Sequence, residues 1–161
     1  MTDTADLAWR RPAGYFRLRV AAIIVRDRHL LTASVPGCPY SFLPGGKVGF
    51  GEVTREALVR ELVDGLGVQL PIGELALVSE NLVAADETSH HFCFYYRVDW
   101  PEDLSLEGVN AAAEDRRRCA WSPMDRLRSL PFRPAALVDH LLDLPRSVSH
   151  GDWPGRGGRG W

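Results

Sequence analysis

The sequence contains no continuous apolar run that approaches the length of a membrane-spanning helix. Its amino terminus lacks the apolar core of a secretory signal, so we expect a cytoplasmic protein. The formal net charge of −2 provides no overall field that would attract nucleic acid or an anionic membrane surface. We therefore expect no membrane partner, and nucleic acid is disfavoured as a ligand.

Cysteine and lysine are both scarce. Cys38, Cys93 and Cys119 form an odd set without paired spacing, which favours reduced thiols over a disulfide framework. Lys47 is the only lysine in a chain that otherwise uses arginine. It follows two glycines, where an anionic substrate would arrive, and we expect it to contact that substrate.

The chain of 161 residues, 45% of them hydrophobic, is long enough for one domain with a substantial core. We expect a loose polar arm over residues 1–14 and a folded domain over 15–145. Residues 146–161, rich in glycine and arginine with two tryptophans, are expected to form a flexible tail. The oligomeric state is open, and a homodimer is compatible with the sequence.

Apolar periodicity and turn residues predict the order of the secondary structure. Residues 15–25 and 30–34 are expected to pair as a hairpin around 27–29. Further strands are expected at 75–80, 91–99 and 119–122, and helices at 54–66, 124–130 and 134–144. This order is compatible with an α/β/α sandwich around a mixed sheet.

The predicted helix over 54–66 has one apolar and one acidic face. Leu58, Leu62 and Leu66 recur every four residues and form one apolar ridge. Glu61 and Asp64 are three residues apart and project from a neighbouring face. Two carboxylates held that close repel each other unless a cation lies between them. The helix can therefore supply ligands for a hard divalent ion such as Mg²⁺, which prefers oxygen.

A fixed spacing surrounds this helix. Glu52 follows Gly46 by six positions, Arg60 and Glu61 follow eight and nine positions later, and Gly67 closes the run. With Leu62, Val68 and a conservative Asp64, this pattern resembles the Nudix box, the signature of hydrolases that cleave nucleoside diphosphates linked to another moiety. The resemblance implies an α/β fold of the Nudix type, an α/β/α sandwich with a mixed β-sheet.

The resemblance also implies roles for individual residues. Glu61 would be a metal ligand or the base that activates water, Asp64 a metal ligand, and the carbonyl of Gly45 a further ligand for Mg²⁺ or Mn²⁺. Glu52 would be a supporting acid near the metal. Arg60 would orient Glu61 or Glu52 through charge-assisted hydrogen bonds rather than touch the substrate.

Gly65 is the departure from the Nudix box, because the family has a second glutamate at this position. Glycine donates no side-chain oxygen, so water or an acid from elsewhere would have to fill the gap. Glu114 is a candidate metal ligand, although Glu114 and Asp115 also fit a solvated run of charges. Glu80 and His91 lie in segments that resemble one branch of the family, and they are candidate substrate contacts.

Three functions remain open from the sequence. The favoured one is a metal-dependent hydrolase that cleaves a small nucleoside diphosphate derivative at its diphosphate linkage. The second is a catalytically weak or inactive Nudix-fold module that binds a ligand, and Gly65 motivates it. The third is a hydrolase of a non-nucleotide diphosphate in a biosynthetic pathway.

Overall fold

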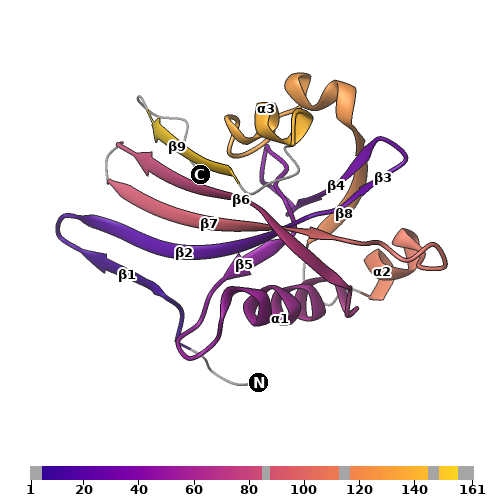
Figure 1. Cartoon of the computed structure of the whole chain (residues 1–161), viewed down its shortest axis with the longest axis horizontal. Helices are drawn as coiled ribbons and strands as arrows, with labels where there is room; N and C mark the ends of the chain where they lie inside the picture. The colour runs from indigo at the N-terminus through magenta and orange to yellow at the C-terminus, as the bar shows by residue number, and fades with distance from the viewer. Residues whose placement is uncertain (1–4, 85–87, 113–116, 145–148, 156–161) are drawn as a thin grey trace.

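The computed structural model describes residues 5–84, 88–112, 117–144 and 149–155. Within these ranges, six strands form a mixed sheet in the order β1-β2-β7-β6-β9, with β5 pairing beside β2 (Figure 1). The strands of this sheet are β1 (Ala8–Arg11), β2 (Gly14–Ile23), β5 (Gly45–Lys47), β6 (Ile72–Val83), β7 (Ser89–Val98) and β9 (Ser149–Gly155). The mixed sheet predicted from the sequence is therefore confirmed.

The centre of the sheet joins strands that are far apart in the sequence. β2 runs parallel to β7, with Tyr15 opposite Ser89 and Ile23 opposite Arg97. β6 is antiparallel to β7 and parallel to β9. β1 and β5 both pair antiparallel with β2, so β5 lies beside the strand that carries Arg19.

A smaller sheet contains β3 (Val25–Arg26), β4 (His29–Ser34) and β8 (Arg118–Pro123), in that order. β4 pairs with β8 from His29–Pro123 to Ser34–Arg118, so the start of β8 lies near the loop that leads to β5. The turn between β3 and β4 places Asp27 and Arg28 at positive φ. The expected hairpin is thus present, but its first strand is only β3, because β2 pairs in the other sheet.

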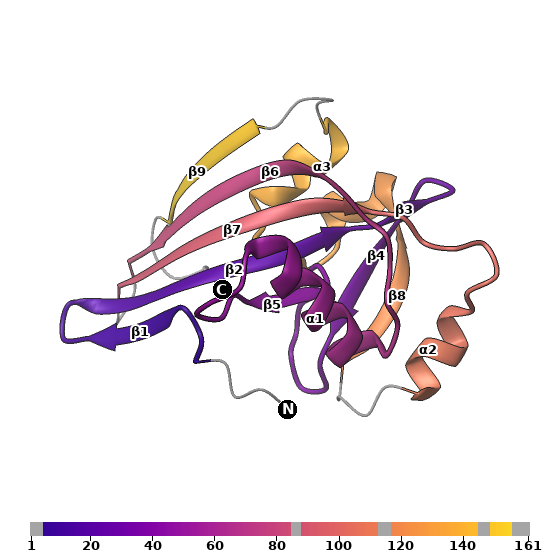
Figure 2. The ribbon, with the colours of Figure 1, turned by 60° about the horizontal axis from the view of Figure 1, so that its bottom comes forward.

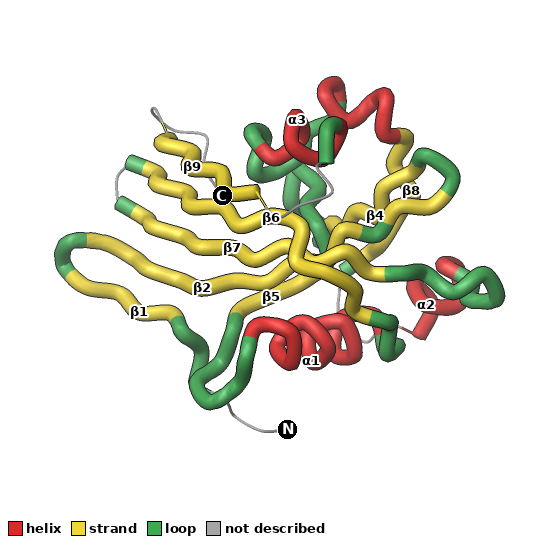
Figure 3. Tube along the Cα trace, in the orientation of Figure 1, coloured by secondary structure: helices red, strands yellow, loops and turns green. Residues whose placement is uncertain are grey.

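Helices cover both sides of the main sheet. Helix α1 (Thr54–Leu66) lies on one side, and the 3-10 helix η1 (Met124–Ser129) lies with α3 (Leu137–Leu142) on the other (Figures 2 and 3). Residues of β2 alternate between the two cores: Val20 and Ala22 pack with α1, and Ala21 and Ile23 pack with α3. This is the expected α/β/α sandwich.

Helix α1 begins and ends close to where the sequence predicts. Its leucine ridge is buried, with Leu58 0%, Leu62 1% and Leu66 3% exposed. Gly67 takes a left-handed φ of 70°, as a helix-ending glycine does. The amino-terminal cap residue is Val53, and the hydroxyl of Thr54 hydrogen-bonds the Tyr96 hydroxyl at 2.6 Å.

Several other elements differ from the sequence-based predictions. The arm expected to be loose contains β1, and the tail expected to be flexible contains β9. Helix α2 (Leu106–Ala112) is not predicted at all. β9 gains its hydrogen bonds from β6, which is distant in sequence and which local patterns do not reveal. β1 instead pairs with the next strand, β2, with Arg11 opposite Gly14 across a two-residue turn.

Leu62→Ala should lower the free energy of unfolding by about 2–5 kcal/mol, because it leaves a cavity under α1. Val63→Ala is the matched control on the same helix, since Val63 is 41% exposed. It should change stability by no more than about 0.5 kcal/mol. Denaturant unfolding measures both, and equal losses would contradict the burial described here.

Candidate active site

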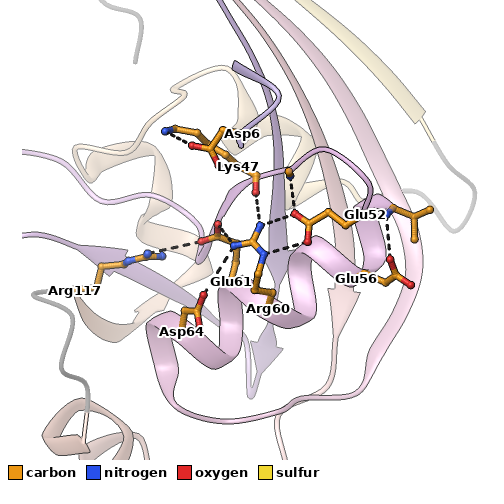
Figure 4. Close-up of polar contacts among 10 residues, drawn as sticks. Asp6, Lys47, Glu52, Glu56, Arg60, Glu61, Asp64 and Arg117 are labelled. Carbon is orange, nitrogen blue, oxygen red and sulfur yellow. Dashed lines mark hydrogen bonds and ion pairs between the residues drawn. The ribbon is translucent and has the colours of Figure 1, made fainter. Parts of the chain in front are cut away.

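Arg60 holds the acidic residues around α1 in place. Its guanidinium donates to both oxygens of Glu52, at 2.6 and 3.1 Å, and to Oε1 of Glu61 at 2.8 Å (Figure 4). A further bond of 2.9 Å reaches the carbonyl of Lys47. One side chain thus connects the helix, the preceding loop and strand β5, with charge-assisted hydrogen bonds.

Glu52 lies behind Arg60 rather than in an open cavity. Besides Arg60, it accepts the backbone N–H of Gly49 at 2.6 Å. The hydrogen bonds from Arg60 hold the pKa of the Glu52 carboxyl below its ordinary value, against the opposing effect of burial and with help from Gly49. Glu52 therefore remains ionised at neutral pH as the anchor of Arg60.

Glu61 faces a cavity of about 560 Å³. The cavity lies against β2, β5, α1 and the loop between β4 and β5, and the residues that line it are Asp6, Arg17, Arg19, Val35, Cys38, Tyr40, Phe42, Gly45, Gly46, Lys47, Glu61 and Arg117. Cavities of roughly 300–1,000 Å³ are typical of small-molecule sites. A nucleotide-sized ligand therefore fits beside the Glu61 carboxylate.

Gly46 allows the Glu61 carboxylate to approach strand β5. A Cβ on Gly46 would collide with the carbon and both oxygens of that carboxylate. A larger residue at this position would therefore force the Glu61 carboxylate to move from its present place. Glycine at position 46 of β5 thus permits a close approach of side chain to backbone.

More basic than acidic side chains line the cavity. The four basic residues are Arg17, Arg19, Lys47 and Arg117, and the two acidic residues are Asp6 and Glu61. Arg17 and Arg19 occupy alternate positions of β2 and so share one face. Burial, together with neighbouring Arg19, lowers the pKa of Arg17 to about 10, so Arg17 stays charged at neutral pH. Lys47 pairs with Asp6 at 2.7 Å. This wall favours an anionic ligand.

The other part of the cavity is less polar, with Val35, Cys38, Tyr40 and Phe42 among its lining residues. Aromatic and aliphatic surface of this kind can contact the flat face of a nucleobase or another apolar group. The cavity therefore offers a carboxylate, several cations and an apolar region to one ligand.

The NUDIX domain model matches residues 15–141 of the chain. The chain belongs to the Nudix family. It is 32% identical to the Mycobacterium tuberculosis protein named "Putative 8-oxo-dGTP diphosphatase 2" over 110 residues, which make up 66% of this chain and 70% of that protein. As a Nudix hydrolase by family, the chain is an enzyme, and the name of this relative describes a diphosphatase of a nucleotide derivative.

Solved structures share this fold. The mutator MutT protein from Bacillus halodurans superposes with a TM-score of 0.70 over 86% of this chain and 89% of its own, at 19% identity. The MutT Nudix hydrolase from Burkholderia pseudomallei gives a TM-score of 0.61 over 80% of this chain and 97% of its own, at 26% identity. No helix among the described residues is long and apolar enough to cross a membrane.

The Nudix fold does not bring all the predicted residues together. Glu61, Gly45 and Lys47 line the cavity, and Asp64 lies at the exposed side of α1 with Arg60 Nη1 3.9 Å from its carboxylate. Glu80 is instead paired with His90 at 2.7 Å, away from the cavity-lining residues. Glu114 lies outside the described residues.

His91 is buried, at 2% exposed, and is not among the residues that line the cavity. Burial, followed by the charges of Arg17 and Arg19, lowers its pKa to about 3. His91 is therefore neutral at physiological pH, and its position does not suit direct contact with a substrate in this cavity.

Sequence reasoning missed Arg17, Arg19, Tyr40, Phe42 and Arg117 as cavity residues. A signal was available for the first two, since arginines at alternating positions of an otherwise apolar strand imply one charged face. Arg117 offered no such signal, because it is one of three consecutive arginines and lies 72 positions after its partner Gly45.

Nudix hydrolases generally use divalent metal ions. The carbonyl of Gly45 and the carboxylates of Glu61 and Asp64 are hard oxygen donors, which suit Mg²⁺ or Mn²⁺ in chemical type. In the part of the chain that the structure describes, no three Asp, Glu, His or Cys side chains gather as a metal site. The backbone carbonyl and oxygens of the ligand would have to complete the coordination shell.

Glu52→Gln should make the free energy of unfolding depend less on pH at acidic pH. In the wild type, the lowered pKa of Glu52 gives a stabilisation that is complete above the ordinary value of 4.5 and is lost as the pH falls through the lowered value. Glutamine does not titrate, so the variant lacks this loss. Urea unfolding between about pH 7 and pH 3 measures it, and parallel profiles would contradict the assignment.

Proposed function

We propose that the protein hydrolyses the diphosphate linkage of a nucleoside diphosphate joined to another group, which includes nucleoside triphosphates. The products would be a nucleoside monophosphate and pyrophosphate or a phosphorylated partner. The observation that carries the proposal is the cavity itself, in which the Glu61 carboxylate faces a wall of arginines and Lys47. The activity in the name of the M. tuberculosis relative supports the same class of substrate.

The basic residues bind and orient the phosphates. Arg17, Arg19 and Lys47 line one cavity and come from the neighbouring strands β2 and β5. Guanidinium groups match phosphate oxygens with paired hydrogen bonds, whereas the ammonium acts as a point charge. Positioning of this kind supplies much of the catalysis in phosphoryl transfer.

Glu61 would act on the attacking water. Its side chain is only 13% exposed, and Oε1 is fixed by Arg60. Oε2 lies 3.9 Å from Arg117 Nη2, beyond hydrogen-bond distance, and is the oxygen that would accept a hydrogen bond from water. A carboxylate held in this way orients the water and accepts its proton. Arg60 and Glu52 support this role without contact with the substrate.

A divalent cation, Mg²⁺ or Mn²⁺, would be held by Glu61, Asp64 and the Gly45 carbonyl and would neutralise charge on the diphosphate. Gly65 contributes no ligand, so this set is smaller than the Nudix box otherwise provides. Apolar residues such as Tyr40 and Phe42 would contact the nucleoside.

Glu61→Gln should lower turnover by about 10²- to 10⁴-fold, because the amide cannot accept the proton from water. Glu56→Gln is the matched control: Glu56 is exposed on the same helix, and an amide oxygen can still accept its hydrogen bond from the Val53 N–H. The control should keep wild-type turnover.

The assay is chromatographic separation of products from a panel that contains nucleoside triphosphates, 8-oxo-dGTP, and sugar- and nucleoside-linked nucleoside diphosphates, with Mg²⁺ or Mn²⁺. Prenyl and sugar diphosphates form a second panel, and activity confined to it would support the non-nucleotide alternative. Nucleotide binding without products in any reaction would support a ligand-binding module and sink the hydrolase proposal.

A further inference from the structure

The Gly45 carbonyl already accepts a hydrogen bond from a cation. Arg117, which immediately precedes β8, donates to this oxygen from Nη1 at 2.9 Å. Its Nη2 lies 3.9 Å from Oε2 of Glu61 (Figure 4). One guanidinium therefore reaches two of the three oxygen donors that suit a divalent ion.

Gly65 leaves the space that this guanidinium needs. It is buried on α1, one helical turn after Glu61, so both positions share a face. A Cβ on Gly65 would lie 3.1 Å from Nη1 and 3.3 Å from Cζ of Arg117, which is closer than ordinary van der Waals contact. The observed position of the Arg117 guanidinium therefore depends on the lack of a side chain at Gly65.

The charges around Glu61 are already balanced by arginine. Arg60 binds Oε1, and Arg117 lies near Oε2 on the opposite side of the carboxylate (Figure 4). A divalent ion on Oε2 and the Gly45 carbonyl would lie within a few ångströms of the guanidinium. Repulsion between like charges at that separation disfavours the presence of both.

We propose that the Arg117 guanidinium occupies the position of a divalent ion in this cavity and competes with such ions for the oxygens of Gly45 and Glu61. An incoming diphosphate is the group that can draw the guanidinium away, because phosphate oxygens offer it paired hydrogen bonds. Arg117 thereby becomes a substrate-binding residue that releases the metal ligands as it binds. This second step rests on the proposed function, whereas the competition for oxygens does not.

Mn²⁺ titration by calorimetry, without nucleotide, tests the competition. Arg117→Gln should tighten Mn²⁺ binding by about 10- to 100-fold, a range typical of changes next to a metal site. Arg117→Lys keeps the charge nearby and should remain close to the wild type. Arg118→Gln is the matched control, because it removes a neighbouring charge from an exposed side chain that donates to the Arg117 carbonyl at 3.0 Å.

A second pair of variants approaches the same site from the helix. In Gly65→Glu, the new carboxylate can pair with Arg117, so the gain in Mn²⁺ affinity should be modest. In the double variant Gly65→Glu with Arg117→Gln, the new carboxylate and the oxygens of Gly45 and Glu61 are all available to the ion. Mn²⁺ binding should therefore be at least about tenfold tighter than in Gly65→Glu alone. Thermal unfolding in the same buffer confirms that each variant is folded at the titration temperature.

Equal Mn²⁺ affinity in the wild type and Arg117→Gln would overturn the proposal. So would a Gly65→Glu variant that binds as tightly as the double variant, or an Arg117→Lys variant that binds as tightly as Arg117→Gln. Because no substrate is present, these outcomes are independent of the hydrolysis assay. Loss of products there with Mn²⁺ competition intact would reject the hydrolase and keep the role of Arg117.

Discussion

The contacts of Arg60 are the constraint on which the site depends. Its guanidinium joins Glu52 in the loop before α1, Glu61 on the helix and the Lys47 carbonyl on β5, at distances between 2.6 and 3.1 Å. These bonds fix the helix against the strand and aim one oxygen of Glu61 at the cavity. Without them the acidic face of α1 would be an ordinary solvated surface.

Two glycines leave the space that charged side chains of the site occupy. Gly46 lets the Glu61 carboxylate press against β5, and Gly65 leaves room for Arg117. By its resemblance to the Nudix box, the sequence implies that the first belongs to the shared pattern and that the second stands where the pattern has an acid. A guanidinium next to Glu61, with no carboxylate at position 65, favours bound anions over bound metal ions, as proposed above.

The sequence predicts the local features of this protein well and the long-range ones poorly. Helix α1 follows from its leucine spacing and from Gly67, because these signals lie within one segment. Strand β9 and the parallel pairing of β2 with β7 depend on partners far away in the chain. Glu61 could be assigned to the site because its spacing from Glu52 and Gly46 lies within one segment of the sequence. Arg117 could not be assigned in this way, since its contacts with Gly45 and Gly65 exist only after folding.

The most direct measurement of the central claim is a crystal structure of the wild-type protein grown with Mn²⁺ and without nucleotide, with anomalous scattering used to locate the ion. The account predicts that the Arg117 guanidinium lies between the Gly45 carbonyl and Glu61, with no manganese bound to those two oxygens. Strong anomalous density bonded to both oxygens, with Arg117 turned away, would contradict it.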